Sequence, residues 1–259
     1  MNAPLAQFQR DRLSVIVCEN KAAAGEQSAA AAAQLIQAAV ENRGKAAVIF
    51  ASAVSQDYFL AALRVDPRVD WTRVTAFHLD EYVGMEAGHE QSFRRYLHEH
   101  LFRFVKIGQF HGLRGEADDL EFECARYSGL LRDHAPDLVV LGIGENGHLA
   151  FIDPPLCDFN DPKDVRVVEL DRDCRQQQVN DGAFPTIEDV PGQALSLTVP
   201  YFLRVPAAVI TTGGPRKRNA VTRALDGPIE ESCPASALRL HLNAQLFCDG
   251  ESYPGYKSA

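Results

Sequence analysis

The sequence lacks the features that would place it in several common protein classes. In its 259 residues no segment approaches the 18 uninterrupted apolar residues of a membrane-spanning helix. The first residues, MNAPLAQFQRDRLSVIV, contain no signal-peptide hydrophobic region. The six cysteines form no CxxC pair and are expected to be reduced thiols that pack in the interior. These absences predict a cytoplasmic protein with no membrane partner.

The chain also lacks an excess of positive charge. Its 26 basic and 35 acidic side chains give a formal net charge of −9. This balance argues against nucleic acid as a general partner, although a local basic pocket for a small anion stays open. The hydrophobic fraction of 46% and the charged fraction of 24% are ordinary for a globular protein, so no disulfide or metal is needed to hold the fold.

Apolar strand-like runs alternate with helical segments along almost the whole chain. Such an alternation is typical of an α/β fold with a mostly parallel sheet and helices on both faces. No repeat or linker interrupts it, so residues 1–259 are expected to form a single domain, with a polar, lid-like excursion at about 153–191. Strands are expected at 13–18, 46–51, 74–79, 138–143, 165–170, 195–199, 207–212 and 246–248, and helices at 19–43, 56–63, 92–105, 120–134 and 215–225.

In such a sheet the chemistry lies in loops at the carboxyl ends of the strands. One of these loops, Gly142-Ile-Gly144-Glu-Asn-Gly147, matches GxGxxG. A dinucleotide site would need a helix directly behind it, and two prolines at 154–155 leave little room for one. We therefore predict no dinucleotide cofactor, and interpret the glycines as a sharp turn that approaches a small ligand.

His148 follows this turn, with Asn146 just before it and Asp153 five residues after. A nearby carboxylate orients an imidazole and tunes its pKa, as acid–base catalysis near neutral pH requires. A structural histidine is the alternative. Asp80 and Glu81 follow another buried strand. They could form a surface ion-pair feature, or one could act as a general base. In the second case one side chain would face the substrate and the other would support the loop.

Two further loops offer groups that bind phosphate. Gly213-Gly214-Pro-Arg-Lys217-Arg lies where a strand leads into a helix, and a bound phosphate there would accept backbone N–H groups and pair with a cation. A solvated basic patch is the alternative. Ser52 and Ser55, after another strand, offer two hydroxyls for the same anion. HExxH spacing and a GxSxG elbow are absent, so we predict no metal and an acid–base enzyme acting on a small phosphorylated substrate.

At these loops the sequence resembles the glucosamine-6-phosphate deaminase (isomerase) family, which is related to 6-phosphogluconolactonases. The resemblance covers about residues 15–249 and is strongest in FHLDEYVGM (77–85), DLVVLGIGENGHLAFIDPP (137–155) and CPASALRLHLNAQLFCD (233–249). It implies a Rossmann-like domain without cofactor or catalytic metal. It also implies conversion of an amino-sugar 6-phosphate and water to fructose 6-phosphate and ammonia, with glucosamine 6-phosphate as the expected substrate.

The resemblance also assigns roles to single residues. Asp80 matches the base that moves a proton between C2 and C1 of the opened sugar, and His148 matches the residue that helps to open the ring. Lys217 matches the phosphate-binding lysine if the extra residue in GGPRK is placed before it. The remaining candidates are Asn146 and Asp153 as partners of the imidazole, and Ser52, Ser55, Glu81, Gly144, Gly147 and Arg175 in substrate binding, Arg175 as a second phosphate ligand.

The sequence departs from the family pattern in ways that keep alternatives open. Asn146 stands where many members have Asp, Asp153 stands where many have Glu, and the phosphate loop carries Val54 in place of glycines. Members that act on galactosamine 6-phosphate share the Asn, so that epimer is an alternative substrate. Two further alternative functions are a 6-phosphogluconolactonase-like hydrolase and a non-catalytic sugar-phosphate sensor. The family includes hexamers and monomers, so a homo-oligomer stays open.

Overall fold

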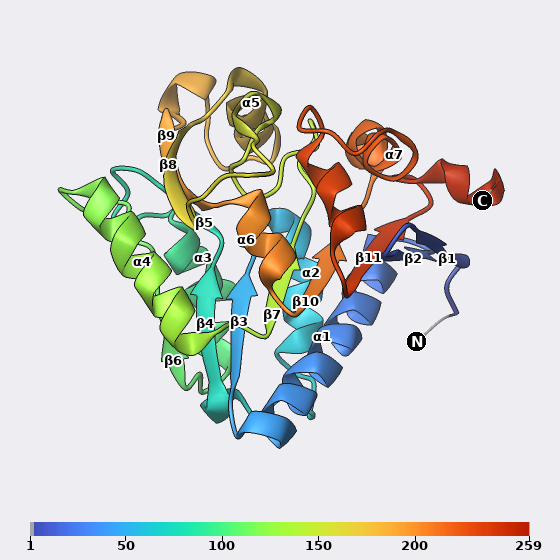
Figure 1. The fold of residues 1–259 in the computed structure, drawn as a ribbon, viewed down its shortest axis with the longest axis horizontal. Helices are drawn as coiled ribbons and strands as arrows, with labels where there is room; N and C mark the ends of the chain where they lie inside the picture. The colour runs from blue at the N-terminus through green and yellow to red at the C-terminus, as the bar shows by residue number, and fades with distance from the viewer. Residues whose placement is uncertain (1–2, 259) are drawn as a thin grey trace.

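The computed structural model describes residues 3–258, which form two β-sheets with helices around them (Figure 1). The larger sheet is parallel except for the edge pair β1–β2, as the sequence predicts for its central strands. Its strand order is β1 (Ala6–Arg10), β2 (Leu13–Cys18), β11 (Ala244–Asp249), β10 (Ala207–Thr211), β7 (Leu138–Leu141), β3 (Ala46–Phe50), β4 (Val74–His78) and β6 (Gln109–Phe110).

Both faces of this sheet are buried, which explains the continuous apolar runs of its strands. Successive residues of a strand point to opposite faces, and in β2 Val15 and Val17 join one core cluster while Ile16 and Cys18 join the other. One face is covered by α1 (Lys21–Arg43), α2 (Asp57–Leu63) and α3 (Phe93–His100), and the other by α4 (Leu120–His134), α6 (Val199–Arg204) and α7 (Arg218–Asp226). The predicted α/β architecture with helices on both faces is therefore confirmed.

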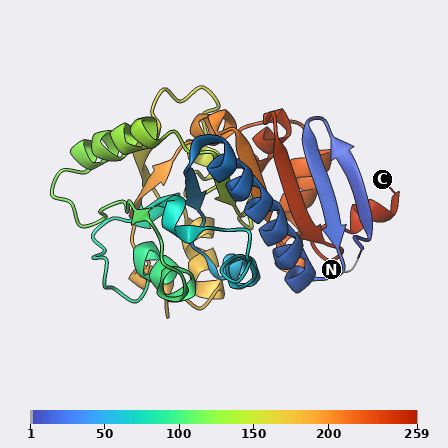
Figure 2. The ribbon, with the colours of Figure 1, turned by 90° about the horizontal axis from the view of Figure 1, so that it is seen from below.

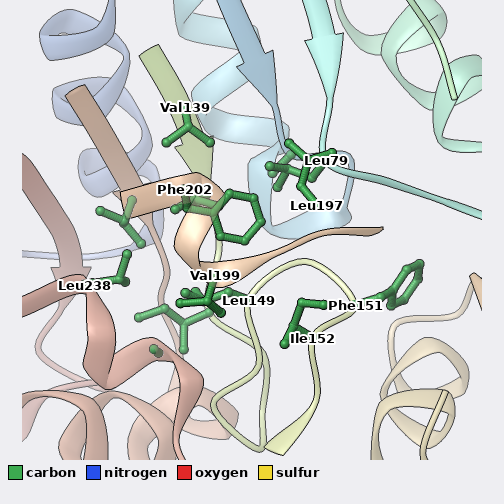
Figure 3. Packing of buried hydrophobic residues seen from close by; sticks show 14 of the residues in the cluster. Leu79, Val139, Leu149, Phe151, Ile152, Leu197, Val199, Phe202 and Leu238 are labelled. Carbon is green, nitrogen blue, oxygen red and sulfur yellow. The ribbon is translucent and has the colours of Figure 1, made fainter. Parts of the chain in front are cut away.

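The small side chains of α1 let it lie close to the sheet, which it crosses at an angle (Figure 2). Its buried face is made mainly of alanines, and its C-terminal cap is Gly44 with a φ of 75°. On the opposite face larger side chains fill the space, with Phe202 and Val199 of α6 packed among Val139 and Leu238 (Figure 3). No helix within the described residues is both long and apolar enough to cross a membrane.

The expected strands at 165–170 and 195–199 exist, but they do not join the parallel sheet. They are β8 (Val165–Glu169) and β9 (Gln193–Leu197), which pair antiparallel with each other in a smaller sheet, and β9 also pairs antiparallel with β5 (Asp80–Tyr82). Parallel strands are usually joined by a crossover that contains an α-helix. Between β7 and β8 the chain has only the short 3-10 helix η4 (Pro154–Leu156), and β8 pairs antiparallel outside the parallel sheet.

The polar excursion at 153–191 holds a helix that the sequence does not predict. This helix is α5 (Arg172–Asn180), and it is followed by η5 (Ile187–Asp189). The side chain of Asp171 caps it by accepting from the N–H of Cys174 at 2.7 Å. α5 lies beyond the carboxyl ends of the parallel strands (Figure 1), which places it over the loops that carry the candidate residues.

Candidate active site

The four loops named from the sequence meet in one pocket at the carboxyl edge of the parallel sheet. They follow β3, β4, β7 and β10, and parallel strands deliver such loops to the same edge. Six of the predicted site residues line this pocket: Ser52, Ser55, Asp80, Gly144, His148 and Lys217. The structure thus brings together a carboxylate, an imidazole, a cation and two hydroxyls that are far apart in the sequence.

Asp80 presents a buried carboxylate to the pocket. It opens β5, where its backbone pairs with Ser196 of β9, so the smaller sheet fixes its position. The residue is 7% exposed, and within residues 3–258 no hydrogen bond to its carboxylate is formed. Burial, together with the neighbouring charge of Glu81, raises the pKa of Asp80 well above its usual value. A carboxylate with a raised pKa is a stronger base once it is ionised.

Glu81, which the sequence predicts to take part in substrate binding, does not line the pocket. Its side chain is fully buried and points away from the pocket. It accepts hydrogen bonds from Ser92 Oγ at 2.8 Å and from the guanidinium of Arg94 at 3.1 Å. Alternation along β5 sends adjacent side chains to opposite sides, so only Asp80 can face the substrate. Glu81 instead anchors α3 to the loop that carries Asp80.

The turn after β7 places the His148 ring directly over Gly144. The N–H of Gly144 donates to the carbonyl of His148 at 3.0 Å, which closes the turn. A Cβ atom on residue 144 would lie 2.2 Å from Nε2 of the imidazole, so any other residue would displace the ring. Gly147 adopts a φ of 94° in the same turn but does not line the pocket. Its role is conformational, because this backbone angle favours glycine.

Asp153 lies beside the imidazole of His148, and Asn146 contacts the Asp153 carboxylate and the backbone of His148. Asp153 is fully buried, and its Oδ1 lies 3.2 Å from Nδ1 of His148, within ion-pair range but not aligned for a hydrogen bond. Asn146 donates to the same Oδ1 at 3.0 Å and accepts from the N–H of His148 at 2.9 Å. Burial opposes ionisation of Asp153, but His148 and Asn146 outweigh it and lower its pKa.

Lys217 is the cation that faces the pocket. It ends the 3-10 helix η6 (Pro215–Lys217) and is 8% exposed, and burial lowers the pKa of its ammonium although Asp181 and Glu145 oppose this. Arg216 turns outward to Glu145 at 3.3 Å and Asp181 at 2.6 Å. Within the described residues the Lys217 ammonium has no ion pair or hydrogen bond. An anionic ligand would supply the missing partner.

The loop after β3 adds polar groups next to Lys217. Ser52 Oγ is buried without a hydrogen-bond partner, which leaves it available to a ligand. Gln56, in the 3-10 helix η1 (Val54–Gln56), donates to the carbonyl of Thr211 and contacts Ser55 Oγ, both at 3.3 Å. Val54, which the sequence resemblance places in the phosphate loop, is exposed and has no left-handed backbone angle. The loop therefore forms without glycine.

Arg175 does not reach the pocket, in contrast to the prediction that it binds phosphate. Its guanidinium donates to the carbonyls of Ile187 and Val190 at 2.6 and 3.0 Å, which ties α5 to η5. The pocket wall on this side consists of residues that the sequence reasoning missed: Gln177, Gln178 and Asp181. These residues lie on or just after α5, which has almost no apolar periodicity. The helix-capping residue Asp171 was the one sequence feature that could have indicated this helix.

A donor set for a metal ion is also present within the described residues. His148, Asp153 and Cys174 of α5 place their ligand atoms within 4.8 Å of one another. This group could not be recognised from the sequence, because the three residues follow no metal-ligand spacing. No comparable arrangement for a dinucleotide exists in the turn at Gly144, since that turn leads into a short bridge between Leu149 and Ile152 rather than a helix.

Comparison with known proteins shows to which family this chain belongs. Residues 19–247 match the model of the family described as glucosamine-6-phosphate isomerases/6-phosphogluconolactonase. This chain belongs to that family. The glucosamine-6-phosphate isomerase/6-phosphogluconolactonase family is the one that the three sequence motifs indicate, so the resemblance is confirmed.

Relatives with 34–36% sequence identity to this chain are named glucosamine-6-phosphate deaminases. A glucosamine-6-phosphate deaminase of Staphylococcus epidermidis is 36% identical over 202 residues, covering 76% of this chain and 81% of the relative. One of Bacillus thuringiensis is 34% identical over 227 residues, covering 88% and 84%. A solved structure described as a monomeric glucosamine-6-phosphate deaminase superposes with a TM-score of 0.84 at 28% identity, over 92% of this chain and 98% of that one.

The fold is shared more widely than the sequence. A 6-phosphogluconolactonase of Trypanosoma brucei superposes with a TM-score of 0.76 at 15% identity, covering 98% of this chain and 100% of that one. At that identity the likeness concerns the fold alone. The choice between activities therefore depends on the side chains in the pocket.

Proposed function

We propose that the protein is an isomerising deaminase that converts glucosamine 6-phosphate and water to fructose 6-phosphate and ammonia. One observation carries the proposal: Asp80 and His148 face the same pocket, and Lys217 lies at that pocket without an anionic partner. The reaction needs a base for carbon, an acid–base group for the ring oxygen and an anchor for phosphate. The names of the relatives, which are at least 34% identical, support the same reaction.

In this mechanism each pocket group has one task. His148, held by Asp153 and Asn146, transfers a proton at the ring oxygen and opens the pyranose. Asp80 in its ionised form takes the proton from C2, and its carboxylic acid then delivers a proton at C1, which leaves an imine at C2. The carboxylic proton exchanges with solvent between the two steps, so a solvent hydrogen reaches C1. Water adds to that imine and ammonia leaves. Lys217 and Ser52 hold the phosphate, so remote binding energy keeps the reacting carbons near Asp80.

Ammonia release from purified protein tests this function. Glucosamine 6-phosphate, galactosamine 6-phosphate and 6-phosphogluconolactone would be supplied separately, with ammonia and acid release measured for each. We expect ammonia from glucosamine 6-phosphate. Ammonia from the galactosamine epimer alone would reassign the substrate, hydrolysis of the lactone alone would assign a lactonase, and binding without either product would assign a sensor.

The space above Gly144 gives a first prediction. Gly144→Ala should lower kcat by about 100-fold, because its Cβ would displace the His148 ring by roughly an ångström. Gly142→Ala is the matched control, since a Cβ there would lie 3.3 Å or more from its nearest neighbours, Gln56 Nε2, Ser55 Oγ and the Thr211 carbonyl. Steady-state kinetics of the two variants decide the matter. Equal losses in both would contradict a specific effect on His148.

The unpartnered ammonium gives a second prediction. Lys217→Met should raise KM for the sugar phosphate by about 10- to 100-fold, the size of a lost hydrogen bond to a charged group, with a smaller effect on kcat. Lys21→Met removes an exposed lysine that packs against the same turn at Gly214 and serves as control. Equal effects of the two substitutions would indicate general attraction of the anion instead of a specific contact with Lys217.

A further inference from the structure

Three buried side chains from separate parts of the chain meet beside the pocket. His148 and Asp153 come from the loop after β7, and Cys174 comes from the first turn of α5. They are 7%, 0% and 0% exposed. Their ligand atoms lie within 4.8 Å of one another. The cluster therefore joins the catalytic loop to the helix that covers the pocket.

The polar atoms of this cluster are not fully used by the protein. His148 Nδ1 is buried without a hydrogen-bond partner, although Asp153 Oδ1 lies 3.2 Å away. Asp153 Oδ1 accepts from Asn146 at 3.0 Å and Oδ2 from the N–H of Asp171 at 3.4 Å, and the carboxylate also forms a hydrogen bond with the Cys174 thiol. The two oxygens have four lone pairs between them, so the carboxylate keeps acceptor capacity for a further partner.

The surroundings of the cluster are rich in negative charge. The carboxylates of Asp153, Asp171 and Asp80 all act on the Cys174 thiol, and they raise its pKa in addition to the effect of burial. The cation that faces the same group is Lys217, whose pKa burial lowers. A divalent cation would offset this excess of negative charge at the point where the three donors meet.

We propose that His148, Asp153 and Cys174 form a binding site for a zinc-like divalent cation. Zinc takes nitrogen, oxygen and sulfur ligands at about 2.0 to 2.3 Å, which places two ligands of one tetrahedral ion about 3.3 to 3.7 Å apart. His148 Nδ1 and Asp153 Oδ1, at 3.2 Å, already have about this separation, whereas the distances to Cys174 Sγ, which are within 4.8 Å, need to shorten by at most about 1.5 Å. A thiolate with an imidazole and a carboxylate suits Zn²⁺ or Co²⁺, whereas Mg²⁺ and Ca²⁺ select oxygen donors.

Binding changes both the thiol and the histidine. The Cys174 thiol releases one proton to solvent and its sulfur forms a bond to the ion, while neutral His148 binds through Nδ1. The ion then links α5 to the catalytic loop and occupies the groups that orient the imidazole. Zinc is therefore a reversible inhibitor of turnover, a consequence that rests on the proposed function, whereas the site itself does not.

Cobalt absorption tests the site without any substrate. Chelator-treated protein would be titrated with Co²⁺ and the absorption spectrum recorded. We expect one equivalent to bind, with a near-ultraviolet thiolate-to-cobalt charge-transfer band and the visible bands of tetrahedral cobalt. Cys174→Ser should lose the charge-transfer band and Asp153→Asn should weaken binding. Cys124→Ser, which removes a buried thiol of α4 outside the cluster, should keep both the band and the affinity.

The outcomes separate this site from the proposed function. No charge-transfer band in the native protein, or a band that persists in Cys174→Ser, would overturn the site. Zn²⁺ should inhibit the native enzyme reversibly, and Cys174→Ser should resist inhibition when each protein is compared with its own metal-free rate. A cobalt site in a protein that releases no ammonia would leave the site intact and overturn only the function.

Discussion

Replacing Asp80 by asparagine is expected to lower kcat by about 10²- to 10⁴-fold, the range typical for loss of a general base. Affinity for the sugar phosphate should change little, because the proposed function places the phosphate at Lys217 and Ser52, which line the same pocket. The fold should not be weakened. The pKa of Asp80 is raised in the folded protein, so any stability it contributes is lost as the pH rises through that pKa, and asparagine mimics the protonated form.

Three measurements check this prediction: steady-state kinetics, sugar-phosphate affinity and thermal unfolding at neutral pH. Asp181→Asn makes the same chemical change elsewhere in the pocket wall and should retain kcat. The native pH–rate profile adds a test, because the base must be ionised. Activity should fall with decreasing pH well above the usual aspartate pKa of about 3.9. Turnover by Asp80→Asn at a rate near that of the native protein would remove Asp80 from its role.

Replacing Arg94 by methionine should destabilise the protein by about 3 to 5 kcal/mol, the cost of leaving a buried charge without its partner. The guanidinium lies between Glu81, at 3.1 Å, and Glu116, at 2.7 Å, and it also donates to the carbonyl of Met85 at 2.7 Å. Glu81 is fully buried and would keep only hydrogen bonds from neutral groups, such as Ser92 Oγ.

Arg95→Met is the matched control on the same helix. Arg95 is only partly buried and donates to one carbonyl, that of Gly88, at an exposed position. Its loss should change the free energy of unfolding by less than about 0.5 kcal/mol. Denaturant unfolding of both variants measures the difference. A similar small effect for both would show that the Glu81–Arg94 pair does not anchor the loop of Asp80.

The parallel sheet could be predicted because its strands are buried on both faces. β3 and β7 are uninterrupted apolar runs between helical segments, a pattern with few other solutions. The smaller sheet could not be predicted in the same way. β5 has three residues, all polar or aromatic, and its pairing with β9 depends on contacts across more than a hundred residues. α5 is polar and is stabilised by its cap and by Arg175.

The site divides along similar lines. The meeting of Asp80, His148 and Lys217 could be predicted because they lie in segments that follow strands of one parallel sheet, which brings them to one edge. The role of Glu81 could not be predicted, because it depends on a contact with Arg94 of α3. Arg175 does not line the pocket, because its guanidinium donates to the carbonyls of Ile187 and Val190. The charge and sequence position of an arginine do not predict which groups its guanidinium contacts in the folded protein.

Solvent-deuterium transfer tests the central claim most directly. The native protein would be incubated with glucosamine 6-phosphate in deuterated water, with ammonia measured and the product examined by mass spectrometry and NMR. We predict one ammonia for each fructose 6-phosphate and deuterium at C1 of the product, both abolished in Asp80→Asn. Formation of no ammonia, together with hydrolysis of 6-phosphogluconolactone and unchanged amino-sugar phosphate, would contradict the account.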